Sequence, residues 1–235
     1  MSRIYVFGLL LCGVVIGVFW NASFAYAVGP QFLVSWKPQV YAPVWYEGKL
    51  FPVKDSVVRV SFEMVDQNAP DQGKVIDLSN SEVRWYVGGE LVRKGIGLQS
   101  LAIKNNLFSG DAIEVKIAAD FFDSQTGERY FAEKYVSIPV VDRQLLLVRR
   151  AMGDTFAPHA QATWYAVPLF FSSAPQNLAL TWTVNGQTVQ PISGNPFSLT
   201  IQSGDSGQTA DIQVSLTNPA SLWENASAYE RIYIK

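Results

Sequence analysis

Apolar and polar residues alternate with a period of two along most of this chain. In residues 58–64, every second side chain is apolar, from Val58 to Met64, and the side chains between them are polar or charged. Residues 210–217 repeat this pattern, and residues 113–117 show it over a shorter length. Successive side chains of a β-strand point to opposite faces, so the alternation predicts half-buried strands. No stretch after the first 28 residues keeps a helical period, which indicates an all-β protein.

Fourteen short strands can be assigned, seven in each half of the chain. In the first half they fall near residues 32–36, 57–65, 83–87, 90–94, 98–103, 111–119 and 130–138. In the second half they fall near residues 145–150, 162–171, 180–184, 187–190, 197–201, 209–217 and 228–234. Many short strands separated by turns are typical of a β-sandwich or a β-barrel.

The two halves also share sequence motifs. Three pairs of segments match at a nearly constant offset: 85–92 with 182–189, 100–103 with 198–201, and 133–138 with 230–235. A constant offset over three pairs indicates a duplicated domain. We therefore expect two tandem immunoglobulin-like (Ig-like) β-sandwiches, one over residues 28–141 and one over 142–235, with a short linker near 140–143.

Each repeat carries a tryptophan followed by a tight turn. The turn residues are Gly88, Gly89, Asn185 and Gly186. Such pairs suit a two-residue type I′ turn, in which both central residues need a positive φ. The turn predicts that Trp182 pairs with Val189, and that Trp85 pairs with Val92 in the same way. We expect both tryptophans to be structural core residues that fill the space between two sheets.

This pattern resembles the bacterial Ig-like and PKD-like modules of surface proteins. The segment 36–49, which contains WKP, YAP and YEGK, is also similar to uncharacterised bacterial envelope proteins of this build. The resemblance covers both repeats, and its motifs are structural. It implies an exported envelope protein and transfers no catalytic or binding residue to this chain.

The first 27 residues carry an export pattern. Arg3 precedes a continuous apolar run over residues 4–20, and small residues follow it up to the A-x-A pattern at residues 25–27. We expect a cleaved signal peptide, with an uncleaved membrane anchor through residues 4–20 as the alternative. In both cases the rest of the chain is exported to the periplasm, the cell surface or the medium, and meets a membrane only through this segment.

Charge and cysteine content narrow the function classes. The chain has 18 basic and 20 acidic residues, and removal of residues 1–27 takes away only Arg3, which leaves 17 against 20. A nucleic-acid partner is excluded because no positive cluster is present. The single cysteine, Cys12, lies in the export segment, so disulfides and thiolate metal sites are unavailable to the exported part. Nothing in the sequence calls for a cofactor.

One segment imitates a protease motif. Residues 204–207 (GDSG) match the nucleophile motif of chymotrypsin-type proteases, but Gln208 stands where that family needs another glycine. His159 is too close upstream for a fold of two barrels, and residues 109–111 form the corresponding turn of the first repeat. We expect no catalytic residue, and therefore not an enzyme.

Carboxylates in three loops raise an alternative hypothesis, namely that the chain has a calcium site. They are Asp66, Asp71, Asp77, Asp120, Asp123 and Glu128. In an Ig-like sandwich these loops lie at one end, where carboxylate oxygens could bind Ca²⁺. We expect no metal site, because no ligand spacing matches a known calcium loop and residues 123–128 also fit a polar hairpin turn.

Aromatic residues gather in residues 36–51, which we call the aromatic segment. They are Trp36, Tyr41, Trp45, Tyr46 and Phe51. A second unusual segment, residues 218–224, is expected to be a loop and contains Trp223. In end-to-end Ig-like tandems this loop points back toward the first domain, so we expect Trp223 and part of the aromatic segment to bury each other. If they do not, the aromatic segment becomes a site for a protein or a glycan.

Three hypotheses about function follow from the sequence. The favoured one is a non-enzymatic structural or interaction module of the cell envelope, such as an appendage component, an adhesin or an assembly partner, with a protein partner. The second is a carbohydrate-binding protein that uses the aromatic segment. The third and weakest is a hydrolase whose acid and base come from the loop carboxylates.

Overall fold

A computed structural model describes most of the chain after residue 29. It covers residues 30–66, 74–122, 127, 129–150, 155–157, 159–189, 195–200, 202, 205 and 207–235. The expected signal peptide or anchor lies outside these residues. Within them, the only helix is the three-residue 3₁₀ turn η1 (Pro175–Asn177), and no helix is long and apolar enough to span a membrane.

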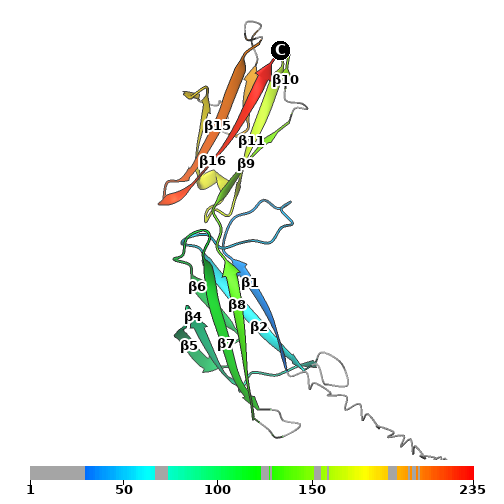
Figure 1. Cartoon of the computed structure of the whole chain (residues 1–235), viewed down its shortest axis with the longest axis vertical. Coiled ribbons are helices and arrows are strands. Elements are labelled where there is room, and N and C mark those ends of the chain that lie inside the picture. Colours follow the sequence, from blue (N-terminus) through cyan, green and yellow to red (C-terminus); the bar gives the residue numbers. More distant parts are fainter. Residues whose placement is uncertain are drawn as a thin grey trace, which may run out of the picture.

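The first sandwich packs two sheets face to face, at the lower end of the molecule in Figure 1. Its strands are β1 (Gln31–Pro38), β2 (Val57–Asp66), β3 (Lys74–Val75), β4 (Glu82–Val87), β5 (Glu90–Ile96), β6 (Ser100–Lys104), β7 (Ala112–Phe122) and β8 (Arg129–Pro139). One sheet has β2 in the middle, paired with β1, β3 and β6, and the other has the order β5-β4-β7-β8. All these pairs are antiparallel.

The second sandwich repeats this plan end to end with the first. Its strands are β9 (Gln144–Arg149), β10 (Thr155–Phe156), β11 (Gln161–Leu169), β12 (Ala179–Val184), β13 (Gln187–Val189), β14 (Phe197–Thr200), β15 (Thr209–Asn218) and β16 (Ser221–Ile234). One sheet has the order β14-β11-β9 and the other β10-β16-β15-β12-β13. β10 pairs in parallel with the end of β16, whereas no strand covers the outer edge of β8 in the described part of the first sandwich.

The all-β tandem sandwich expected from the sequence is confirmed. Every strand assigned by the period of two is present, and the described residues add the two-residue strands β3 and β10. The physical reason is visible in β2, where Val58, Val60, Phe62 and Met64 are buried and the residues between them face outward. Only the inward face can exclude water, so the alternation decides which face packs on the opposing sheet.

Tryptophans occupy the centre of both cores. Trp85 and Trp182 are fully buried, and the ring of Trp85 lies 5.6 Å from that of Phe62 on the opposing sheet. Trp182 stacks on Phe197 at 5.0 Å. A third buried tryptophan, Trp164, was not identified from the sequence. Each core therefore closes around large aromatic rings without a disulfide.

The repeated turns have the expected backbone. Gly88 and Gly89 have φ of 58° and 86°, and Asn185 and Gly186 have φ of 48° and 77°. The register after the second turn is also as expected, because Trp182 pairs with Val189.

The pairing expected for Trp85 is wrong. Trp85 lies opposite Arg93 and Tyr86 lies opposite Leu91, so an extra residue, Val92, bulges out of β5. A bulge of this kind places two residues of one strand opposite one of its partner and bends the strand. The exposed edge position of β5 tolerates such a bend, because few packing contacts oppose it.

Candidate functional site at the joint between the sandwiches

The loop between β1 and β2, residues 39–56, joins the first sandwich to the second, and we call it the joint loop. Tyr41 forms an isolated antiparallel bridge with Phe171. Its N–H donates to the Phe171 carbonyl at 2.6 Å, and its carbonyl accepts from the Phe170 N–H at 2.7 Å. In Figure 1 the loop projects from the first sandwich beside the base of the second. The two sandwiches are thus tied by backbone hydrogen bonds as well as by the linker.

Apolar side chains fill the space around this bridge, and we call them the joint cluster. Val53, Leu169 and Phe170 are buried in it. Partly buried residues surround them, namely Val40, Ala42, Tyr46, Leu50, Phe51 and Val141. Phe170 is the central ring, 5.9 Å from Tyr46 and 6.4 Å from Phe51, with both partners edge-on. The cluster draws on both sandwiches, so burial of its apolar surface favours one relative orientation.

Phe170 adopts a backbone conformation that is uncommon for a large residue. Its φ is 66°, in the left-handed region. A residue with a β-carbon enters this region at a steric cost, so surrounding contacts must compensate for it. Here the ring contacts of the joint cluster and the hydrogen bond to Tyr41 hold the residue in place.

A polar network lies beside the joint cluster and centres on Arg143 of the linker. One terminal nitrogen of Arg143 donates to the Lys54 carbonyl at 2.7 Å, and the other donates to the Trp223 carbonyl at 3.1 Å. Arg143 Nε lies 3.7 Å from Glu224 Oε1. One guanidinium therefore connects the joint loop, the linker and the β15–β16 hairpin.

Glu224 is the buried partner of this network, with only 1% of its surface exposed. One carboxylate oxygen accepts from the Ser172 N–H. The other accepts from the Ser172 hydroxyl at 2.6 Å and from Asn218 Nδ2 at 2.7 Å. A buried carboxylate needs several such donors to replace the water that it loses. Phe170, Arg143 and Glu224 were not identified from the sequence, although Glu224 shares the inward phase of Ala226 and Ile232.

The expectation that Trp223 is buried against the aromatic segment is wrong. Its side chain is 69% exposed, and only its backbone carbonyl reaches the joint. The reason is the register of β16, which pairs regularly with β15 up to Asn225, opposite Thr217, and shifts before the terminal pair of Asn218 with Ser221. Strand alternation then turns Glu224 inward and leaves Trp223 outward.

Most aromatic side chains of the aromatic segment pack against other residues and are not free to bind a ligand. Trp36 lies 5.8 Å from Phe51 and under the Lys49 ammonium, and Tyr41, Tyr46 and Phe51 are half-buried. Trp45 is the exception, with 58% of its surface exposed at the tip of the joint loop.

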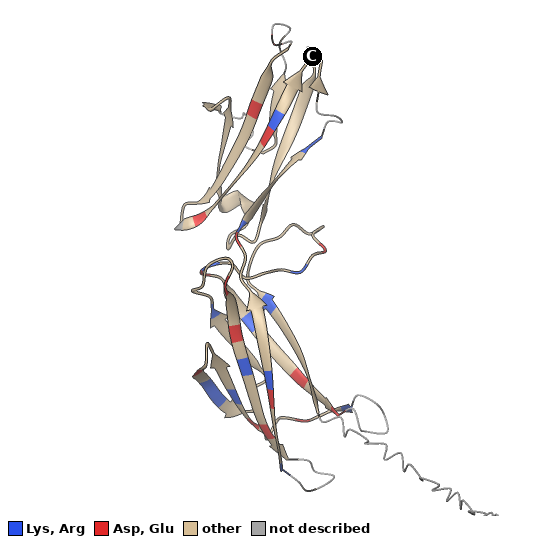
Figure 2. Cartoon of the chain, viewed as in Figure 1, with Lys and Arg blue, Asp and Glu red and all other residues tan. Residues whose placement is uncertain are grey.

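The outer face of the β5-β4-β7-β8 sheet carries paired charges (Figure 2). Glu82 pairs with Arg84 and Lys94, and Lys116 pairs with Glu133. Hydrogen bonds from Lys94 and Arg84 lower the pKa of Glu82, and the bond from Lys116 lowers the pKa of Glu133.

Every shifted carboxyl pKa among the described residues is shifted downward. The Ser79 backbone N–H lowers the pKa of Asp77, and hydrogen bonds from Arg231 and Tyr229 lower that of Asp211 to about 2. A general acid that works near neutral pH needs the opposite shift, so these groups are unsuited to acid catalysis.

The calcium candidates do not come together in the described part of the chain. There, no group of three or more carboxylate, histidine or cysteine side chains is placed to hold a metal ion. Asp120 forms a bidentate pair with Arg129 at 2.6 and 2.7 Å, and Asp77 accepts from the Ser79 N–H at 2.9 Å. Asp66 ends β2, opposite Lys74. The remaining candidates, Asp71, Asp123 and Glu128, lie outside the described residues.

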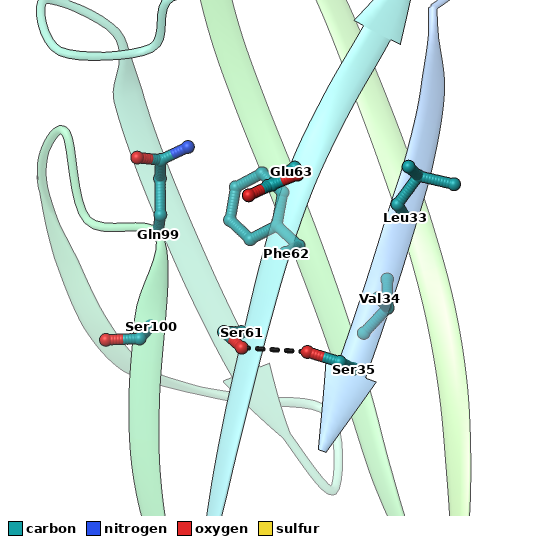
Figure 3. Close-up of a pocket in the computed structure, with 8 residues that line it drawn as sticks. All are labelled: Leu33, Val34, Ser35, Ser61, Phe62, Glu63, Gln99 and Ser100. Atoms are coloured by element: carbon teal, nitrogen blue, oxygen red, sulfur yellow. Dashed lines mark hydrogen bonds between the residues drawn. The ribbon is translucent and has the colours of Figure 1, made fainter. Parts of the chain in front are cut away.

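A shallow groove of about 450 Å³ crosses the outer side of β1, β2 and β6 (Figure 3). Ser35, Ser61 and Ser100 form a row across the three strands, and the first two hydroxyls lie 3.0 Å apart. Glu63 is the only ionisable side chain among the residues that line the groove. Glycoside hydrolysis uses a pair of carboxyl groups, so this groove lacks the required partner.

The protease-like segment has the features of a turn. Asp205 Oδ2 accepts from the Gln202 N–H at 2.8 Å, and the Gly207 N–H donates to the Ile234 carbonyl at 2.9 Å. Gly204 and Ser206 lie outside the described residues. His159 is exposed, with a φ of 65° in a turn.

Comparison with known proteins shows similarity of fold. No family model and no curated protein matches the chain. The three N-terminal domains of the highly immunogenic outer capsid protein (Hoc) of bacteriophage RB49 share 14% identity, with a TM-score of 0.42, over 87% of this chain and 59% of that chain. Fibronectin(III)-like modules of Clostridium thermocellum CbhA share 13% identity, with a TM-score of 0.29, over 86% and 94%. Murine CEACAM1b shares 14% identity, with a TM-score of 0.30, over 78% and 95%.

Proposed function

We propose that this protein is an exported, non-enzymatic interaction module of the cell envelope that binds a protein partner through the tip of the joint loop. In this proposal residues 1–27 are a signal peptide or an anchor through residues 4–20, and the sandwiches divide between residues 141 and 142. One observation carries the proposal: the joint loop buries part of the aromatic segment in the joint while Trp45 remains 58% exposed.

The contacts of the joint loop support a preorganised tip. The Val141 N–H donates to the Pro52 carbonyl at 3.0 Å, which fixes the returning arm of the loop to the linker. Within the tip, the Tyr46 N–H donates to the Pro43 carbonyl at 2.9 Å and the Tyr46 hydroxyl donates to the Lys49 carbonyl at 3.3 Å. A side chain presented on a fixed backbone loses little conformational entropy when it binds.

The chemistry of the tip favours a protein partner. Val44 is fully exposed next to Trp45. Tryptophan is among the residues that contribute most to protein interfaces, and an adjacent aliphatic side chain enlarges the apolar surface that a partner can bury.

The test is site-specific cross-linking in the native envelope. A photoreactive amino acid at position 45 should form a cross-link to a discrete protein, and the same probe at Phe122 should not. Phe122 is a matched control because its side chain is also exposed, and it lies at the end of β7 away from the joint. A tip that yields no discrete product, or the same products as position 122, would contradict the proposal.

A further inference from the structure

We propose that the outward side of β12, β15 and β16 in the second sandwich binds a neutral polysaccharide chain. We call this surface the hydroxyl face. The proposal is independent of the protein partner at the tip of the joint loop, because it uses other residues on the other sandwich.

Strand register places the residues of the hydroxyl face in rows. Tyr229 lies opposite Gln213, which in turn lies opposite Thr183. The next row contains Ser227, Ser215 and Thr181 in the same order. These rows alternate along the strands with the buried residues Trp182 and Val214, which face the core. Alternation therefore directs the hydroxyl and amide groups of the two rows to solvent.

Two tyrosine rings stand on this face. Tyr229 and Tyr233 are 55% and 52% exposed and lie four residues apart on β16, where Tyr233 pairs with Thr209. Four residues of strand span about 13 Å, so both rings project from the same side at a separation longer than one sugar ring. Aromatic faces offer apolar platforms for the apolar faces of pyranose rings. Asp211 and Arg231 lie in the row between the two rings, and the hydroxyl and amide groups of the other two rows lie level with Tyr229 and beyond it, where they can donate and accept hydrogen bonds. The spacing suits a chain of sugars.

Tyr229 is held in position before any ligand binds. Its hydroxyl donates to Asp211 Oδ1 at 2.7 Å, and Arg231 makes two hydrogen bonds to the same carboxylate at 2.6 and 2.9 Å. The bond to Asp211 also raises the pKa of Tyr229, so the hydroxyl keeps its proton. A fixed ring loses less entropy on binding than a mobile one.

The charge of the surface favours a neutral ligand. Asp211 and Arg231 neutralise each other, and they are the only charged residues of the hydroxyl face among those described. The corresponding face of the first sandwich instead carries Glu82, Arg84 and Lys116. A surface with hydroxyls, amides and one internal ion pair offers no net charge to an anionic polymer.

The absence of exposed aliphatic groups separates this surface from a protein interface. Among the described residues of the hydroxyl face, the large exposed apolar side chains are the aromatic ones on β16. Protein interfaces contain an apolar core in addition to aromatic residues. The hydroxyl face therefore fits a sugar chain better than a second protein.

The experiment measures retention of the full exported chain on insoluble cellulose, chitin and β-1,3-glucan. We expect retention on at least one of them, and a loss of tenfold or more in the double variant Tyr229→Ala/Tyr233→Ala. Tyr135→Ala is the matched control, because Tyr135 is 67% exposed on the first sandwich. Circular dichroism establishes that each variant is folded.

Three results would overturn the proposal. They are no retention of the unaltered chain on any of these polymers, equal retention of the double variant, and equal loss in the Tyr135→Ala control. A fourth result would assign the surface to a protein: the double variant loses a cross-linked protein partner while no polymer retains the unaltered chain. Loss of retention in Trp45→Ala alone would place sugar binding at the tip and would also contradict the proposal.

Discussion

Tyr41 and Phe171 form an antiparallel bridge that fixes the joint loop of the first sandwich to the second sandwich. Two sandwiches connected only by the linker, residues 140–143, could rotate about it. The bridge, the joint cluster and the Arg143 network add contacts that such a rotation would break. We therefore expect one dominant orientation, because a joint with apolar and hydrogen-bonded contacts resists domain motion.

Phe170→Ala should loosen the joint while both sandwiches stay folded. The variant removes the ring that contacts Tyr46 and Phe51. Small-angle scattering should then show a broader distribution of interdomain distances. Phe131→Ala, at an exposed position on β8, is the control and should leave the distribution unchanged. An unaltered distribution in Phe170→Ala would show that the ring does not hold the joint.

Glu224→Gln should destabilise the joint by about 3–5 kcal/mol, the usual cost of breaking a buried charge pair. The amide of the variant has an NH₂ donor in place of one acceptor oxygen, and this donor would face the donor groups of Ser172 or Asn218. The variant also removes the negative charge that lies next to Arg143. Urea unfolding of the full chain measures the change. Glu63→Gln, on the outer side of β2, is the matched control, and equal stability of the two variants would contradict the assigned role of Glu224.

Trp85→Ala and Trp182→Ala should each cost about 3–5 kcal/mol in their own sandwich, because each removes a fully buried indole. A domain is typically stable by about 5–15 kcal/mol, so the loss is a large share of the total. Thermal unfolding followed by circular dichroism measures it. Trp45→Ala should change stability by less than about 0.5 kcal/mol, as is usual at the surface. A similar effect at all three positions would contradict the core assignment.

Asp211 should give the chain an acid-sensitive contribution to stability. Its pKa is lowered from 3.8 to about 2 in the folded state, so the contribution is present above pH 3.8 and is lost as the pH falls through about 2. The Asp211→Asn variant should not lose this contribution. Its melting temperature should therefore fall less steeply between pH 5 and pH 2 than that of the unaltered chain. Glu90→Gln is the control. Parallel curves for Asp211→Asn and the unaltered chain would contradict the assignment.

Lys134→Val should promote self-association. β8 is the outer strand of its sheet, and Lys134 occupies the same inward phase as the partly buried Ala132 and Val136. A charged residue at such a position prevents a second chain from adding to the edge. Light scattering of the full chain should detect the association, whereas Lys235→Val should remain unassociated. A monomeric Lys134→Val protein would contradict this role.

The sequence predicted the elements well, because each depends on neighbouring residues. A period of two specifies strands wherever one face is buried, and Gly88, Gly89, Asn185 and Gly186 specify the turns because those turns need positive φ. The repeated tryptophans indicated the core, since few other positions of a sandwich accept an indole.

The joint depended on information that local patterns do not contain. The aromatic segment predicted a joint, but its partner is Phe170 rather than Trp223. A shift of one residue in a strand exchanges its two faces, so the register of β16 against β15 decided that Glu224 faces inward. The local sequence pattern also failed to predict the bulge opposite Trp85, because it does not reveal an extra residue in an exposed edge strand.

The amino-acid sequence by itself determined the strands, the turns, the duplication and the buried tryptophans, because these follow from short-range periodicity and backbone preferences. Only the tertiary structure decided which loops meet at the joint, which aromatic side chains remain exposed, and which sheet face is charged or neutral. Those properties arise when residues distant in the sequence are brought together, and their energies depend on the register and contacts of the assembled sheets.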